Sequence, residues 1–241
     1  MALKVGELFA SFGIDSSGVN GALKSIEQSI SDMGKRLSLA GGAWTLTVTN
    51  GIVKAGKSIY SAGSSFEKQM SAVAAISGAT GDELEQLTQA AIDMGSTSAF
   101  TATEAGQAMQ YMAMAGWKTE AMLDGLAPIM DLAAASGEDL ATVSDIVTDA
   151  LTAFGLTADK AGDFSNVLAA TATNSNTNVG MLGESFKYVA AVAGSFDYSI
   201  EDVAQALGIM ANSGIKSTMA GTSLRNMMTN MLSTTDEMAE A

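Results

Sequence analysis

One stretch of the chain has the residue types and spacing of a nucleotide site. Residues 51–58 read Gly-Ile-Val-Lys-Ala-Gly-Lys-Ser and match the phosphate-loop pattern, in which four residues separate a glycine from Gly-Lys-Ser or Gly-Lys-Thr. In such a loop the backbone N–H groups wrap the phosphates, the lysine (here Lys57) reaches the outer phosphates and the hydroxyl of Ser58 holds magnesium. The preceding residues 45–49 alternate β-branched side chains as a strand does.

The context of this match favours a different structure. A phosphate loop projects from a parallel sheet, but the residues that follow have the periodicity of helices and lack a second hydrophobic strand that ends in aspartate. As a helix, the same stretch places Ile52, Ala55 and Ile59 on one apolar stripe. We therefore predict a helix across residues 51–58, with nucleotide binding through Gly51–Ser58 as the less favoured alternative.

The rest of the sequence offers little reactive chemistry. The chain has no cysteine and no histidine, which excludes disulfides, thiolate nucleophiles, the usual zinc sites and imidazole catalysis. Two Ser-x-x-Lys matches, at 65–68 and 213–216, have no accompanying motif. Acid pairs at 82–83 and 138–139 stand at predicted helix starts, where carboxylates complement the helix dipole. We predict no catalytic residue, no cofactor, no metal site and no enzymatic activity.

Charge divides the chain into two parts. Residues 1–68 carry seven bases and five acids, whereas the remainder carries five bases and 21 acids, for a formal net charge of -14 overall. The change falls near Gly63, so we predict a basic, apolar, amphipathic segment over 1–63 and an acidic helical region over 64–241. Because such an acidic surface repels phosphates, we expect no specific nucleic-acid binding.

An uncharged run at residues 37–53 raises the question of a membrane. Seventeen residues lie at the lower limit for crossing a bilayer, and the run contains glycine, asparagine and several threonines. A membrane-active segment that forms a conduit for DNA therefore stays a second alternative. The first seven residues include Glu7 where a signal peptide needs its apolar stretch, so we expect synthesis in a cytoplasm.

Glycine spacing predicts an all-α fold. The single proline, 6% aromatic content and 25 glycines suit short helices that end at glycine. We expect helices to end near Gly78, Gly95, Gly116, Gly137, Gly155, Asn174, Gly194 and Gly214, about 20 residues apart. Hydroxyl residues followed by acids predict helix starts at residues 80–83, 101–104, 119–120, 136–139, 157–159 and 199–202.

Within these helices the apolar residues recur at spacings of three and four. Examples are the stripes Leu84, Leu87, Ala91 and Met94, and Leu140, Val143, Val147, Leu151 and Phe154. Because one stripe cannot be buried by one helix alone, we predict helical hairpins packed into an array or bundle. Asp145 and Asp149 fall on the opposite face, where we expect solvation and mild repulsion. The methionines at 109, 112, 114, 227, 228 and 231 are predicted to fill mostly core positions.

Several segments in one order resemble the core region of phage tail tape measure proteins. The resemblance covers about residues 64–232, and a basic amphipathic segment resembling the one that precedes that core lies upstream, from Lys35 to Phe66. The segments that carry it are residues 66–70, 77–80, 99–105, 109–116, 131–137, 149–155, 174–177 and 214–216.

This resemblance implies a structural role. A tape measure protein fills the lumen of the growing tail tube, sets tube length by its own chain length and leaves ahead of the DNA at infection. The expected partners are the tail tube protein, tail-assembly chaperones and further copies of the chain, with a possible host membrane contact at infection; the expected location is the tail tube lumen of the virion. No helix-stop signal follows the pattern that ends at residues 237–241, so we expect the N-terminal part of a longer protein.

Overall fold

The computed structural model describes residues 45–232, with residues 45–60 and 232 by their backbone alone. Every regular element within this range is helical, so the prediction of an all-α fold is confirmed. The elements are α3 (Thr45–Ser77), α4 (Asp82–Thr97), α5 (Ala102–Met114), α6 (Thr119–Ser136), α7 (Leu140–Phe154), the 3-10 helix η1 (Ala158–Lys160), α8 (Ala161–Asn174), α9 (Val179–Ser195), α10 (Ile200–Asn212) and α11 (Ser217–Leu232).

The chain divides into two units between Ser64 and Ser65. Helix α3 runs through this point without a break, so the composition change near Gly63 does not coincide with a loop. A methyl group added at Gly63 would meet no other atom within 4 Å, so this glycine fits a helix without a packing role. A separate role for residues 1–63 and 64–241 stays a prediction.

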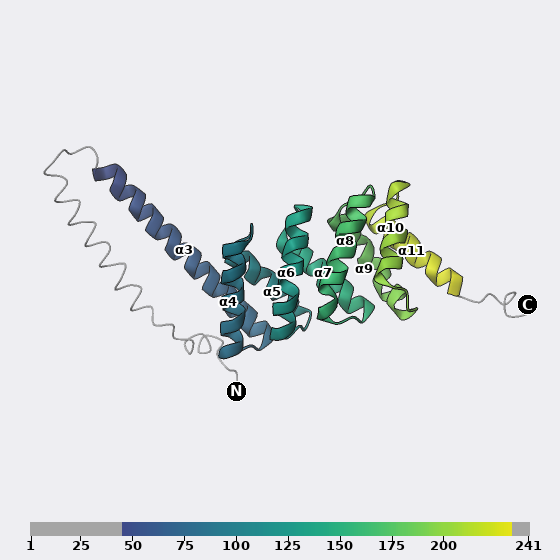
Figure 1. Cartoon of the computed structure of the whole chain (residues 1–241), viewed down its shortest axis with the longest axis horizontal. Helices are drawn as coiled ribbons and strands as arrows, with labels where there is room; N and C mark the ends of the chain where they lie inside the picture. The colour runs from purple at the N-terminus through teal and green to yellow at the C-terminus, as the bar shows by residue number, and fades with distance from the viewer. Residues whose placement is uncertain (1–44, 233–241) are drawn as a thin grey trace, which may run out of the picture. The chain divides into compact units, whose positions relative to one another are not determined.

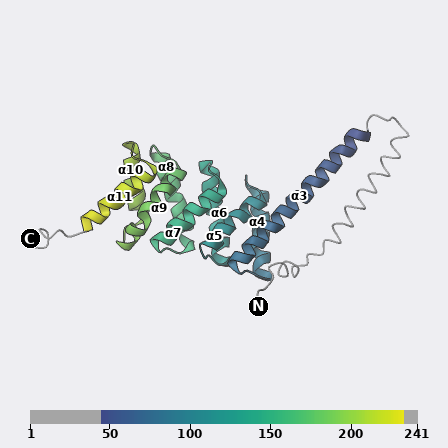
Figure 2. The same ribbon diagram turned by 180° about the vertical axis from the view of Figure 1, so that it is seen from behind.

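The second unit is a two-layer helical array. Helices α5, α7, α9 and α11 pack against one another in succession and form the odd layer, while α4, α6, α8 and α10 do the same and form the even layer. The side chain of Gln69 in α3 donates to the carbonyl of Gly106 in α5 at 3.2 Å, which adds the end of α3 to the odd layer. Successive helices therefore alternate between layers along this unit (Figures 1 and 2), and the predicted array of hairpins is confirmed.

The odd layer has a regular period. Helices α5, α7, α9 and α11 begin 38, 39 and 38 residues apart, so one helix pair constitutes one structural repeat. At equivalent positions these helices carry a small residue where each crosses the preceding odd helix. The four residues are Gly106, Ser144, Gly183 and Gly221, again spaced by 38, 39 and 38.

These small residues permit unusually close helix crossings. A Cβ added at Gly183 would lie 2.5 Å from the side chain of Ile146, and one added at Gly221 would lie 2.3 Å from the carbonyl oxygen of Ser185. At the serine member of the series, the hydroxyl of Ser144 donates to the carbonyl of Ala108 at 2.9 Å. Larger side chains at these positions would force neighbouring odd helices apart.

The turns between paired helices repeat one hydrogen-bond pattern. After α5, the N–H of Gly116 bonds to the carbonyl of Ala113 and the N–H of Trp117 reaches back to Met112, both at 3.0 Å. This is a Schellman turn, which needs a left-handed residue followed by an apolar contact. Equivalent turns occur at 155–156, 197–198 and 214–215, with positive φ at Gly155, Asp197 and Gly214.

The predicted helix ends near Gly95 and Gly194 are confirmed, since α4 ends at Thr97 and α9 ends at Ser195, but neither glycine is the residue that terminates its helix. Gly95 lies inside α4 and Gly194 lies inside α9. Both glycines allow another part of the backbone to pack closely against the helix, and neither forms a turn. A Cβ at Gly95 would lie 2.4 Å from the backbone nitrogen of Ala102, and one at Gly194 would lie 2.9 Å from the Cα of Phe154. The left-handed residue after α9 is Asp197, with a φ of 58°.

Among the described helices, α5, α7, α9 and α10 begin with a side-chain cap. Thr101 and Ser199 form capping boxes with Glu104 and Asp202, as their sequence spacing predicts. Asp139 caps α7 and Asn178 caps α9. The helix starts predicted near residues 80, 119, 136 and 157 are confirmed, but without hydroxyl caps: the residues before α4, α6 and η1 make no side-chain cap bond and α7 uses a carboxylate.

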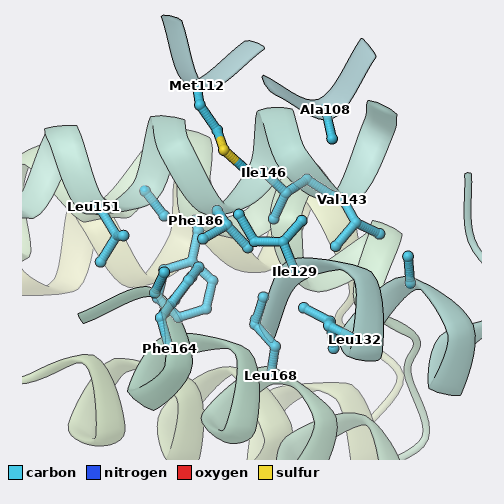
Figure 3. Packing of buried hydrophobic residues seen from close by; sticks show 14 of the residues in the cluster. Ala108, Met112, Ile129, Leu132, Val143, Ile146, Leu151, Phe164, Leu168 and Phe186 are labelled. Atoms are coloured by element: carbon cyan, nitrogen blue, oxygen red, sulfur yellow. The ribbon is translucent and has the colours of Figure 1, made fainter. Parts of the chain in front are cut away.

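The core follows the line where the layers meet. Phe164 of α8 packs edge-on against Phe186 of α9 with ring centroids 5.2 Å apart. Figure 3 shows side chains from α5, α6, α7, α8 and α9 converging in this region. Helix α7 is buried on more than one stripe, because Ser144, Ile146 and Thr148 are buried together with the predicted stripe. The prediction of a single apolar stripe per helix is therefore wrong for α7, which has neighbours in both layers.

The methionines predicted to fill mostly core positions divide between core and surface. Those that are buried are Met109, Met112 and Met228. The others, Met114, Met227 and Met231, are 64%, 51% and 73% exposed, so the prediction of a core position is wrong for them.

The crossing glycines give a direct test of this packing. We expect Gly221→Ala to lower the free energy of unfolding by about 1–3 kcal/mol, because the added methyl group meets the backbone of Ser185, which cannot rotate away. Gly162→Ala in α8 is the matched control, since its nearest neighbour would be Pro128 at an ordinary 3.7 Å. In the control, the free energy of unfolding should rise by roughly 0.5–1 kcal/mol, because alanine has a higher helix propensity than glycine. Urea unfolding followed by circular dichroism measures both, and equal effects would contradict the proposed packing role.

Candidate functional site

The phosphate-loop match lies within a continuous helix. Residues 51–58 fall inside α3, as do residues 45–49, which resemble a strand in sequence. In the interior of an α-helix the backbone N–H groups bond to carbonyls of the preceding turn and cannot curl around an anion. The helix prediction for this stretch is confirmed, and a helical backbone does not form the loop that a nucleotide site through Gly51–Ser58 requires.

The other candidates from the sequence are the two Ser-x-x-Lys matches and the two acid pairs. Ser65 is exposed on α3, and the hydroxyl of Ser213 donates to the carbonyl of Ile209 at the end of α10. Asp82 begins α4, whereas Asp139 accepts a hydrogen bond from the N–H of Thr142 at 3.0 Å as the cap of α7. Within residues 45–232 no group of three or more acidic side chains is placed to hold a metal ion. The acid pairs therefore lie at helix starts, as predicted.

A charged cluster joins α7 to α9. The Nζ of Lys187 lies 3.4 Å from a carboxylate oxygen of Asp145 and 3.7 Å from one of Glu184. Asp145 is thus half-buried and paired, which corrects the prediction that it is simply solvated. Asp149, one turn further along α7, completes the cluster and is exposed. This cluster was missed because Lys187 lies 42 residues from Asp145 in sequence.

The pKa values in the cluster reflect its mixed charges. Partial burial raises the pKa of Asp149 above its ordinary 3.8, and the negative charge of Asp145 raises it further, against a lowering by Lys187. Burial lowers the pKa of Lys187, but the neighbouring carboxylates, Asp145 first, outweigh burial and raise it overall. The like-charge repulsion predicted for Asp145 and Asp149 is therefore present. The lysine stays protonated at neutral pH, so the cluster has no group poised for proton transfer there.

The α6–α8 seam contains two adjoining open grooves. One, of about 410 Å³, is lined by Pro128, Gly162 and Ser165 among others, and the second, of about 230 Å³, continues past Ala172 and Thr173. Most of the lining side chains are small and unreactive. The hydroxyl of Ser165 is buried and has no hydrogen-bond partner, an uncommon state for a buried polar group.

A third groove of about 330 Å³ lies near the ends of α7 and α9 and the start of α10. It contains the exposed ion pair between Lys160 and Asp163, which are 3.1 Å apart. None of the three grooves brings a base next to a nucleophile. The most regular feature of the described residues is the repeated helical array.

The membrane alternative finds no support in the described helices. None of the helices between residues 45 and 232 is long and apolar enough to cross a bilayer. Residues 37–44 of the uncharged run lie outside the described residues, and residues 45–53 form the start of α3.

Comparison with known proteins gives a consistent set of similarities. Residues 88–241 match the family described as phage-related minor tail protein. The chain is 38% identical to the tape measure protein of Pneumococcus phage Dp-1 over 209 residues. This aligned region covers 87% of this chain and 18% of the phage Dp-1 protein. The chain is 25% identical over 189 residues to the probable tape measure protein of Escherichia phage P2, covering 78% of this chain and 23% of the relative. The chain thus spans less than a quarter of either relative. No solved structure matches it.

The helical state of residues 51–58 predicts that nucleotide does not bind. Titration of the chain with magnesium-ATP in a calorimeter should give no heat beyond dilution, and Lys57→Ala should give the same trace, because the amides of α3 are already used within the helix. Saturable heat that Lys57→Ala abolishes would contradict this assignment.

The charged cluster predicts a stabilising substitution. Asp149→Asn should raise the free energy of unfolding at pH 7 by about 0.2–0.5 kcal/mol, because it removes the repulsion from Asp145 and the cost of partial burial. A raised pKa in the folded state makes the aspartate costly only where it is charged, so the gain should vanish as the pH falls below 3.8. Urea midpoints at pH 7 and pH 3.5 measure this difference. Exposed Asp93→Asn on α4 is the control and should change little.

Proposed function

The chain belongs to the family of phage-related minor tail proteins, and we propose that it acts in a phage tail as a tape measure. In this role it is a noncatalytic helical filler of the tail tube, whose chain length sets the length of the tube during assembly and which leaves ahead of the DNA at ejection. The similarity to the tape measure proteins of phages Dp-1 and P2 supports this proposal.

The observation that carries the proposal is the 38–39-residue repeat of the second unit. In a repeat array each helix pair contacts only its neighbours, so every added pair extends the array by one similar step. Length is then proportional to the number of residues, which is the physical requirement for a molecular ruler. A globular core lacks this property, because its diameter grows much more slowly than its chain.

The charge of the chain fits a filler that must be released. With a formal net charge of -14, the protein repels DNA instead of adhering to it. Exposed carboxylates are carried by both layers, for example Asp93, Asp124 and Asp131 in the even layer and Asp149 in the odd layer. A filler of the same sign as the genome would leave the tube ahead of the DNA without strong retention by it.

The proposed partners follow from the same role. They are the tail tube protein that surrounds the filler, the tail-assembly chaperones that accompany it before assembly, and further copies of the chain. The proposed location is the lumen of the tail tube in the virion, after synthesis in the host cytoplasm.

A change of repeat number tests the ruler. Deletion of residues 140–178 in the phage gene joins Asp139 to Val179 and removes one repeat, while the new junction keeps a carboxylate cap for α9. If the region measures length as the stacked array, loss of one repeat should shorten the tail by about one spacing between packed odd helices, roughly 10 Å, whereas a single extended helix would give up to about 60 Å, at about 1.5 Å per residue. Duplication of the same residues should lengthen the tail by an equal amount. Electron microscopy of virions measures both variants, and unchanged tails in both would remove this region from the measuring role.

A further inference from the structure

The two grooves of the α6–α8 seam form one continuous surface. Leu132, Ala135 and Ala169 line both of them. The lining residues extend from 127 to 136 on α6 and from 162 to 173 on α8. At about 1.5 Å per residue these stretches are roughly 14–17 Å long, which is the length of about three helical turns. We call this continuous surface the seam groove.

The seam groove is hollow because its side chains are small. Ala135 is exposed and Ala169 is half-buried, while the larger Leu132 is buried beneath them. A methyl group added at Gly162 would lie 3.7 Å from the ring of Pro128, so these two residues face each other across the seam. The groove therefore has room for the side chains of an occupant, and apolar side chains would cover its alanines.

The hydroxyl of Ser165 is a second, independent indication of an occupant. Ser165 lines the seam groove, is 4% exposed and makes no hydrogen bond through its hydroxyl. In the same helix, Thr171 and Thr173 donate to the carbonyls four residues earlier, at 2.7 Å and 2.8 Å. A buried hydroxyl without a partner costs free energy that the seam itself does not offset. Because a serine hydroxyl rotates about a single side-chain bond, a polar group in the groove can supply the missing hydrogen bond.

The rim of the seam groove carries negative charge and hydrogen-bond acceptors. Asp131 lines the groove, and Asp124 lies seven residues earlier on the same face of α6; both are exposed. Pro128 has no N–H, so the carbonyl of Asp124 lacks its usual helical donor. Among the described residues neither aspartate takes part in an ion pair, and the nearby base Lys160 is already paired with Asp163. The rim is therefore complementary to lysine or arginine side chains.

We propose that the seam groove binds an amphipathic helix of another protein, about three turns long, in which lysine or arginine flanks an apolar stripe. The apolar stripe packs on Ala135 and Ala169, a cation pairs with Asp131, and a polar group bonds to the hydroxyl of Ser165. Helices α6 and α8 lie inside the even layer, between α4 and α10, so the groove does not depend on where the described residues begin or end. The inference goes beyond the tape measure role and is independent of it.

Fluorescence anisotropy with a labelled model peptide tests the proposal. The probe is a helix-forming peptide of alanine, leucine and lysine, about 18 residues long, with its leucines on one stripe. A peptide of the same composition in scrambled order and a peptide with glutamate in place of lysine are the probe controls. We expect saturable binding of the probe to the full chain, and at least roughly tenfold weaker binding of either control.

Three variants locate the binding in the seam groove. Ala135→Arg fills the groove and places a positive charge in it, so the probe should bind at least about tenfold more weakly. Ala191→Arg is the matched control, because it adds the same charge at an exposed alanine of α9 in the odd layer and should change binding less than about twofold. Ser165→Ala should raise the urea midpoint of the free chain, since it removes the unpartnered hydroxyl, and yet weaken probe binding. Circular dichroism confirms that each variant is folded.

Several results would overturn the proposal. The first is the absence of saturable binding, or equal binding of the glutamate peptide. The second is equal weakening by Ala135→Arg and Ala191→Arg, because net charge alone would then explain the binding. Sedimentation velocity tests a second copy of the chain as the occupant. Wild-type oligomers that Ala135→Arg eliminates and Ala191→Arg preserves would assign the groove to self-association instead.

Discussion

The close crossing of successive odd helices is the contact on which the rest of the array depends. At Gly106, Gly183 and Gly221 an added Cβ would lie within 3.0 Å of the preceding odd helix, and at Ser144 the hydroxyl bonds to that helix. Helices that approach so closely can interlock the side chains around the crossing and exclude water from both layers. The recurrence of a small residue at this point every 38 or 39 residues therefore sets both the spacing and the register of the repeats.

A chain built on this contact grows in one direction. Each odd helix contacts the odd helix before it and the one after it, and each even helix does the same. The Schellman turns return the chain from one layer to the other with a left-handed residue, which is Gly116, Gly155, Asp197 or Gly214. The length of the array is thus the property that changes as helix pairs are added to the chain. This relation connects the packing of single glycines to the proposed measuring role.

The α6–α8 seam differs from the rest of the even layer. The chain's single proline, Pro128, lies in α6, where it removes one helical hydrogen bond, and two adjoining grooves and the unpartnered hydroxyl of Ser165 lie on the same seam. The odd layer has tight contacts at the same level of the array, including the crossing of Gly183 with Ile146. At this level of the array the odd layer is therefore the more closely packed of the two.

Local chemistry alone determined the class of this protein: caps such as Thr101 and Ser199, left-handed glycines and apolar spacing of three and four define helices from neighbouring residues. The absence of cysteine and histidine likewise limited its chemistry. Tertiary structure alone decided that Gly95 and Gly194 serve close approach, that α7 is buried from both layers, and that Lys187 pairs with Asp145. It also decided which methionines are covered, because burial depends on a neighbour about 38 residues away. Periodicity within one helix carries no information about that neighbour.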